Sequence, residues 1–295
     1  DAVIKRLQDD QYVGIYVSSL RLLDDEKNSG DIKEPFAKLY IAYALEALRA
    51  LNHLKEISPN SVISNAYQNI GKAVAEYVAG AGLAAETTSE FGLERILLNI
   101  QVKLTRGENA YSLKANPSLV FTYLAEAIQN CSSVWNNATV LFLLDDVSTR
   151  YLANPDICKL MSSLLFSDPK CAFKITTEAQ TLETILRSPG LIEQARLGRD
   201  YDVFDLGHAV NEMTRSRDGN NFVEVVLLRR AEHLAQGDVS KIKPSSLLGD
   251  TSLISIARNI GKTAETSNER KKVYWGITAL TSSCVGDIGD IIRIY

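Results

Sequence analysis

Two neighbouring carboxylates follow an apolar segment near the middle of the chain. In "VLFLLDD", residues 140–146, five apolar residues precede Asp145 and Asp146. Such a segment is typical of a strand buried on both faces, as in a parallel sheet covered by helices. Ligands bind open α/β sheets at the carboxyl ends of the strands. The two acids could therefore bind Mg²⁺ and activate water there, or they could simply begin a solvated turn.

Two threonines follow at the end of the next apolar segment. "CAFKITTE", residues 171–178, comes after one helical pattern, as a neighbouring parallel strand does. The hydroxyls of Thr176 and Thr177 could sense a γ-phosphate or position water. Threonine is also common in strands and at helix starts, so the pair by itself favours the structural interpretation.

A triphosphatase built on these residues would also need a loop that holds the phosphates. The sequence contains no G-x-x-x-x-G-K-[ST]. Residues 261–263 (Gly-Lys-Thr) end like this motif, but Ile256 occupies the place of its first glycine and the surrounding pattern is helical. Residues 71–73 (Gly-Lys-Ala) also lack the hydroxyl. Neither segment is expected to bind phosphate.

The elements that must position these residues alternate between strands and helices. Strand patterns occur at 12–17, 140–144, 171–177 and 200–206. Apolar residues at three- and four-residue spacing predict helices at 36–54, 66–82, 90–104 and 118–130, and Asn154-Pro155 begins another. After residue 207 only helical patterns follow.

We therefore expect an α/β domain at residues 1–207, with a helical insertion at about 33–130, and an all-helical domain at 208–295. The composition, 45% apolar and 23% charged, is that of a folded protein, and the net charge of −4 predicts no global basic field for nucleic acid. No apolar run approaches the ~20 residues of a membrane span, and no signal peptide opens the chain. Four well-separated cysteines predict reduced thiols. We expect a cytoplasmic protein without membrane contact.

The order and spacing of these motifs resemble those of AAA+ ATPases of the origin-recognition-complex (ORC) type, specifically their bacterial relatives, with features shared with STAND switch ATPases. The matching segments are residues 140–148 as Walker B, 173–178 as sensor 1, 194–206 as the arginine-finger and fifth-strand segment, and 286–295 as the sensor 2 helix. The resemblance implies a P-loop NTPase-like parallel sheet followed by a helical lid. It also implies that the first strand and the phosphate loop precede Asp1.

The same resemblance implies a role for several residues. Asp145 is the expected magnesium ligand, and Asp146 stands where a glutamate commonly polarises the attacking water. Thr176 or Thr177 corresponds to sensor 1. Arg196 is the expected arginine finger, which reaches the γ-phosphate of a neighbouring subunit, with Arg199 as a substitute; both could instead be ordinary surface charges.

The sensor 2 segment departs from the family pattern. Gly289 occupies the place of the expected arginine, and Arg293, one turn further on, is the nearest candidate to contact the nucleotide. Together with the aspartate at position 146, this departure predicts slow hydrolysis or a nucleotide-bound switch.

The function implied is an ATP-binding and hydrolysing AAA+ ATPase that uses Mg²⁺ and acts as an oligomeric switch or motor on DNA or a partner effector, in a bacterial defence or mobile-element system. The expected partners are further copies of the chain, an effector protein and double-stranded DNA. "ERKK", residues 269–272, could contact DNA phosphates or begin a solvated helix. The alternative is a catalytically weak AAA+-like scaffold for protein–protein contact.

Overall fold

The computed structural model describes residues 12–18, 35–81, 89–106, 111–148, 154–165, 168–187, 196–215, 219–234, 243–249, 252, 254–255, 258 and 276–283. The chain divides into two compact units, residues 1–202 and 203–295. The first unit combines a parallel sheet with helices, which confirms the α/β class expected from the sequence. The described part of the second unit is helical.

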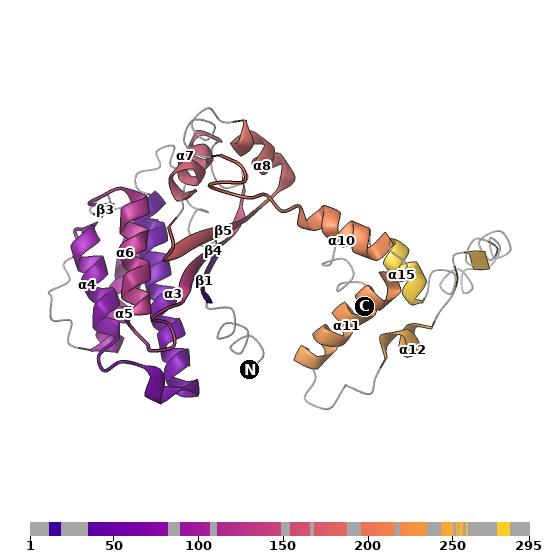
Figure 1. The fold of residues 1–295 in the computed structure, drawn as a ribbon, viewed down its shortest axis with the longest axis horizontal. Helices are drawn as coiled ribbons and strands as arrows, with labels where there is room; N and C mark the ends of the chain where they lie inside the picture. The colour runs from indigo at the N-terminus through magenta and orange to yellow at the C-terminus, as the bar shows by residue number, and fades with distance from the viewer. Residues whose placement is uncertain are drawn as a thin grey trace. The chain divides into compact units, whose positions relative to one another are not determined.

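The sheet of the first unit has three parallel strands in the described part of the chain. They are β1 (Tyr12–Ser18), β4 (Thr139–Val147) and β5 (Cys171–Thr177), in the order β1-β4-β5. Ile15 of β1 lies opposite Phe142 of β4, which in turn lies opposite Phe173 of β5. Because the strands are parallel, their carboxyl ends meet at one edge of the sheet, with β4 in the centre (Figure 1).

One face of the sheet is buried more completely than the other. Val140, Phe142 and Leu144 of β4 are buried, whereas Leu141 and Leu143, which point to the opposite face, are only half-buried. The expectation that this strand is buried on both faces is therefore wrong for the described structure. The difference arises because the helices of this unit pack against the face that carries Phe142.

Four helices lie between β1 and β4 in the described part of the chain, close to the positions that the apolar spacing predicts, although the helix expected at 66–82 ends at Tyr77, where a short strand follows. They are α3 (Pro35–Ile57), α4 (Tyr67–Tyr77), α5 (Glu90–Thr105) and α6 (Pro117–Gln129). Helices α3 and α6 contact the sheet, α4 packs against both of them, and α5 packs against α3 and α4 (Figure 1). A short 3₁₀ helix, η2 (Pro59–Ser61), follows α3, and a two-residue antiparallel pair, β2 (Val78–Ala79) with β3 (Ser112–Leu113), links the outer helices.

Side-chain caps define where two of these helices begin. The Ser89 hydroxyl accepts a hydrogen bond from the backbone N–H of Gly92 at 3.0 Å, at the start of α5. The Asn116 side chain accepts one from the N–H of Ser118 at 3.1 Å, and Pro117 fills the first turn of α6. Such caps satisfy N–H groups that the helix itself leaves unpaired.

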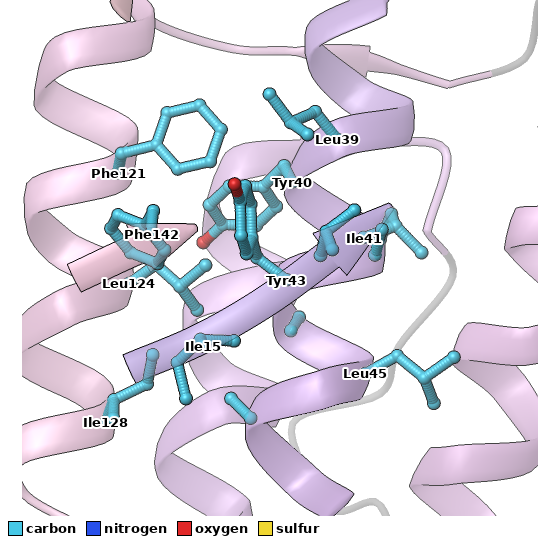
Figure 2. Packing of buried hydrophobic residues seen from close by; sticks show 14 of the residues in the cluster. Ile15, Leu39, Tyr40, Ile41, Tyr43, Leu45, Phe121, Leu124, Ile128 and Phe142 are labelled. Carbon is cyan, nitrogen blue, oxygen red and sulfur yellow. The ribbon is translucent and has the colours of Figure 1, made fainter. Parts of the chain in front are cut away.

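An aromatic cluster joins the helices to the sheet (Figure 2). The Tyr43 ring of α3 lies 4.8 Å from the Phe142 ring of β4, and the Phe121 ring of α6 lies 5.1 Å from the Phe173 ring of β5. Tyr40 meets Phe121 edge-on at 5.6 Å. Each aromatic side chain of this size stabilises the fold by roughly 1.5–3 kcal/mol through burial. The cluster therefore fixes the helices on the strand that carries the two acids.

The chain after β4 returns through α7 (Asn154–Leu164) to β5 and continues into α8 (Ala179–Leu186). The strand expected at 200–206 is not formed. Tyr201 makes only an isolated bridge with Leu197, and Leu206 already begins α10 (Leu206–Arg215). The reason is local: Gly198 turns the chain with φ 78°, and Asp205 accepts a hydrogen bond from the His208 N–H at 2.8 Å, which starts the helix.

The second unit contains α10, α11 (Gly219–Leu234), α12 (Pro244–Leu248) and α15 (Ile277–Ser283) among its described residues. Its described core is small and consists of Val223, Leu227, Ile277 and Leu280, with three partly buried neighbours. Across the described part of both units, no helix combines the length and the apolar character needed to cross a membrane.

Candidate functional site

A pocket of about 400 Å³ lies at the carboxyl ends of β4 and β5. It is lined by Asp145, Asp146, Thr176, Thr177 and Glu178. The structure thus brings together the four residues that the sequence singles out on these two strands, and adds Glu178. They meet because the strands are adjacent and parallel, which places both ends at the same edge.

A β-bulge shapes the pocket. Leu144 pairs with Ile175 and Val147 pairs with Thr177, so Asp145 and Asp146 together oppose the single residue Thr176. Asp146 adopts a left-handed backbone with φ 57°. This conformation is uncommon outside glycine, and aspartate is one of the few residues that adopt it readily. The bulge lets two consecutive acids lie beside the pocket instead of on opposite faces of a regular strand.

The Thr176 hydroxyl connects the two acids. It accepts a hydrogen bond from the backbone N–H of Asp146 at 2.8 Å and donates one to Oδ1 of Asp145. The Thr177 hydroxyl instead donates to the backbone carbonyl of Val147 at 2.6 Å. The geometry therefore distinguishes the two threonines: Thr176 contacts the acids, and Thr177 stabilises the strand pairing.

A tyrosine from β1 completes the surroundings of Asp145. The Tyr16 hydroxyl donates to Oδ2 of Asp145 at 2.8 Å. The hydrogen bond from Thr176 is the main cause that holds the pKa of Asp145 below its ordinary value; partial burial opposes this effect, and the hydrogen bonds from Tyr16 and the Asp146 backbone add to it. Asp145 is therefore an anion at neutral pH, the form that a metal ligand requires.

The donor set at this edge fits a nucleotide-bound Mg²⁺ better than a metal held by protein ligands alone. Each Asp145 oxygen accepts one hydrogen bond from a neighbouring strand and has a further lone pair. Among the residues that the structure describes, no group of three or more His, Cys, Asp or Glu side chains could hold a metal ion. Mg²⁺ commonly binds through one or two carboxylates, with water and substrate phosphates as the other ligands. Asp145 fits that role.

A second cavity, of about 510 Å³, lies where β1 meets α3 and α5. Its polar lining includes Ser18, Glu46, Arg49 and Gln101. Arg49 pairs with Glu46 at 2.6 Å and lies 3.7 Å from Glu94, so two carboxylates compensate its charge. This lining therefore has no excess positive charge for phosphates, and the lining at the ends of β4 and β5, with three acids, has none either.

The two candidate finger arginines lie in a turn at residues 196–201. The Arg199 guanidinium binds Asp200 with two N–H groups, at 2.9 and 2.6 Å, and the Arg196 backbone N–H donates to the same carboxylate at 2.8 Å. The Arg199 hydrogen bond is the main cause that lowers the pKa of Asp200. The Arg196 side chain is exposed and makes no hydrogen bond or ion pair with the described residues. Arg196 is thus the one available to a neighbouring molecule.

Neither arginine lines the pocket at Asp145. Arg293, the candidate nucleotide contact in the sensor 2 segment, lies outside the described residues, as do residues 261–263 and 269–272. Two residues of the site were not predicted from the sequence: Glu178, which lines the pocket, and Tyr16, which donates a hydrogen bond to Asp145. The alternation of β1 identifies Tyr16 as a residue of one sheet face, but only the pairing of β1 with β4 places it beside Asp145.

The chain matches no protein-family model, and neither a curated protein nor a solved structure matches it significantly.

Proposed function

We propose that this protein is a Mg²⁺-dependent ATPase of the AAA+ type, in which the edge formed by β4 and β5 binds and hydrolyses ATP. The observation that carries the proposal is the Asp145 carboxylate at the end of the central parallel strand, hydrogen-bonded to the Thr176 hydroxyl of the adjacent strand. An anionic acid and a neighbouring hydroxyl are what a Walker B strand and a sensor 1 strand must supply.

The proposal gives each residue at this edge a separate task. Asp145 holds the Mg²⁺ through water, and the metal neutralises charge on the phosphates. The Thr176 hydroxyl contacts both the Asp145 side chain and the Asp146 backbone. If this hydroxyl moved when the γ-phosphate is lost, the positions of both acids would change with it. Asp146 lines the same pocket and stands where a base can orient the attacking water. Its short side chain favours slow turnover.

The proposal also requires a phosphate-binding loop. The 295 residues contain no G-x-x-x-x-G-K-[ST], so the proposal depends on a phosphate-binding loop that these residues do not supply. In the described sheet β5 is an edge strand, with one side open to pairing. A parallel strand beside β5 would end next to Thr176, which is where the phosphates must lie if Asp145 holds their metal.

The proposed active form is an oligomer. An arginine finger stabilises charge on a γ-phosphate bound by the adjacent subunit, and Arg196 presents an exposed guanidinium for that purpose. Further copies of the chain are then its first partners. An effector protein or double-stranded DNA is the target on which the switch or motor would act, and the bacterial ORC-like resemblance favours a role in defence or mobile elements.

Substitution of Asp145 by Asn in the full-length protein tests the site. The amide keeps the size of the side chain but removes the charge that holds Mg²⁺, so Mg²⁺-dependent ATP turnover should fall by about 100-fold or more, as when a charge-stabilising group of a preorganised site is removed. A phosphate-release assay measures the turnover, and circular dichroism checks that the fold is kept.

Asp202→Asn is the matched control, because Asp202 is an exposed acid of the same unit outside the pocket. Its turnover should equal that of the wild type. Unchanged turnover in Asp145→Asn would show that this acid does not bind the metal. A wild-type protein that neither binds nor hydrolyses ATP with Mg²⁺ would instead favour the scaffold, in which the fold serves protein–protein contact.

A further inference from the structure

Tyr16 makes a contact with the candidate metal ligand that no motif of the sequence indicates. Its hydroxyl donates to Oδ2 of Asp145 at 2.8 Å, although the two residues lie on different strands and 129 positions apart. Tyr16 lies on the exposed face of β1, in which exposed and buried residues alternate, and it is 52% exposed. Burial therefore does not explain its position, whereas the hydrogen bond does.

The register of the strands explains why Tyr16 reaches Asp145. Tyr16 lies opposite Leu143, so Asp145 is its diagonal neighbour, two residues further along the same face of β4. Diagonal neighbours are about 7–8 Å apart, a distance that only a long or aromatic side chain spans. Tyr12 lies on the same face of β1, but it is opposite Thr139 at the other end of the strand.

The two hydroxyls hold the Asp145 carboxylate from both sides. Tyr16 of β1 donates to Oδ2 and Thr176 of β5 donates to Oδ1, so each oxygen has one donor from a neighbouring strand. Rotation of the carboxylate would break both hydrogen bonds. The group is thereby fixed in one orientation, and hydrogen bonds to an ionised acceptor are among the stronger ones in proteins.

We propose that Tyr16 is a positioning residue for the metal: it orients the Asp145 carboxylate so that its remaining lone pairs face the water shell of Mg²⁺. This inference rests on the proposed function of the site. Tyr16 lines the cavity at β1, α3 and α5 and not the pocket at the ends of β4 and β5, so the role proposed for it is exerted through Asp145. Loss of its hydroxyl should therefore lower the affinity of the site for Mg²⁺ more than its affinity for ATP.

Substitution of Tyr16 by Phe in the full-length protein tests this role, because it removes one hydroxyl and keeps the ring. The Mg²⁺ concentration for half-maximal ATP turnover should rise by about tenfold, the effect expected from losing one hydrogen bond to a charged group. The KM for ATP at saturating Mg²⁺ should change less than twofold. Mn²⁺ affinity in the presence of ADP, measured by electron paramagnetic resonance, should fall by a similar factor without requiring turnover.

Tyr12→Phe is the matched control, since Tyr12 is a 43% exposed tyrosine on the same face of the same strand. It should behave as the wild type. An equal rise in the Mg²⁺ requirement of Tyr12→Phe would indicate a general effect on the sheet and overturn the inference. Wild-type Mg²⁺ dependence in Tyr16→Phe would overturn it as well.

A double-mutant cycle separates this inference from the proposed function. If Tyr16 acts through Asp145, Tyr16→Phe should not reduce Mn²⁺ affinity further in the Asp145→Asn background. Additive losses would show that Tyr16 acts by another route. A wild-type protein without Mg²⁺-dependent ATP binding would overturn both proposals, whereas a Mg²⁺-dependent wild type with an unaffected Tyr16→Phe would overturn the role of Tyr16 alone.

Discussion

Individual hydroxyl groups decide what the acids of this protein can do. Asp145 and Asp146 are adjacent in sequence, but Thr176 bonds the side chain of the first and the backbone of the second. Asp145 is thereby held as an oriented anion, while Thr176 contacts Asp146 only through the backbone N–H of that residue, which also lines the pocket. The difference between a metal ligand and a base can thus arise from which atom a neighbouring threonine contacts.

The arginines of the 196–201 turn give a prediction at the same scale. Arg196→Ala should reduce ATP turnover by about 10³-fold, as for an arginine finger, with ATP binding to each subunit little changed. Arg199→Ala should have a much smaller effect, because the Arg199 guanidinium is already bound to Asp200 within the turn. Steady-state kinetics and nucleotide-binding titrations provide the measurements.

Mixing variants determines whether this finger acts between subunits. Arg196→Ala and Asp145→Asn proteins, each inactive by itself, should recover activity when mixed, since one interface then combines an intact site with an intact finger. Turnover that stays unchanged in both single arginine variants would exclude the interface. A loss in Arg196→Ala without recovery on mixing would indicate that the arginine serves its own subunit.

At the scale of elements, the aromatic cluster between α3, α6 and the sheet contains two buried hydroxyls without a hydrogen-bond partner among the described residues, those of Tyr40 and Tyr43 (Figure 2). A buried polar group without a partner costs about 1–3 kcal/mol. Tyr43→Phe should therefore leave the free energy of unfolding unchanged or raise it by about 1 kcal/mol. Tyr43→Ala should lower it by about 3–5 kcal/mol, because the ring fills the core.

Urea denaturation followed by far-ultraviolet circular dichroism measures both changes. Tyr40→Phe is a second case of the same test, since Tyr40 is fully buried and contacts Phe121. A loss of more than about 1 kcal/mol in either Phe variant would mean that its hydroxyl has a partner that stabilises the fold, because an unpaired buried hydroxyl contributes nothing favourable.

The elements also show what could be read from the sequence and what could not. The helices at 35–57, 67–77, 90–105 and 117–129 follow local rules, apolar spacing and capping residues, and were predictable within a few residues. The strand expected at 200–206 has a suitable pattern, but the turn at Gly198 and the cap at Asp205 prevent it. The strands β2 and β3 have two residues each, which is too short for an alternating pattern to be recognised in the sequence.

The candidate site was predictable in its residues but not in its geometry. The proximity of Asp145 and Thr176 follows from adjacent parallel strands, which the alternation of strands and helices indicates. The bulge and the contact of Tyr16 depend on the register between strands, and no local pattern encodes that register. The proposed difference between Arg196 and Arg199 depends on Asp200, because its carboxylate binds the Arg199 guanidinium. Only the folded turn shows which of the two arginine side chains Asp200 binds.

At the scale of the whole molecule, each unit has its own apolar core. That of the first unit extends across the sheet and its helices, whereas the described core of the second consists of Val223, Leu227, Ile277 and Leu280. Leu227→Ala should destabilise the second unit by about 2–5 kcal/mol, because it leaves a cavity in this small core. The first unit should keep its stability.

Hydrogen exchange analysed by mass spectrometry measures this prediction. Peptides from α11 and α15 should exchange faster in Leu227→Ala, while peptides from α3 and β4 should exchange as in the wild type. Phe142→Ala, in the first core, is the reciprocal control and should affect α3 and β4 instead. Faster exchange throughout the chain in Leu227→Ala would mean that the two units unfold as one.

The left-handed backbone at position 146 limits which amino acids natural selection can place there. Glycine, asparagine and aspartate adopt φ 57° at little cost, whereas longer and β-branched side chains are disfavoured. Only aspartate among these three offers a carboxylate. If the proposed ATPase is correct, this backbone angle disfavours the longer acid that would speed hydrolysis, and the bulge thereby lengthens the time for which ATP stays bound before it is hydrolysed.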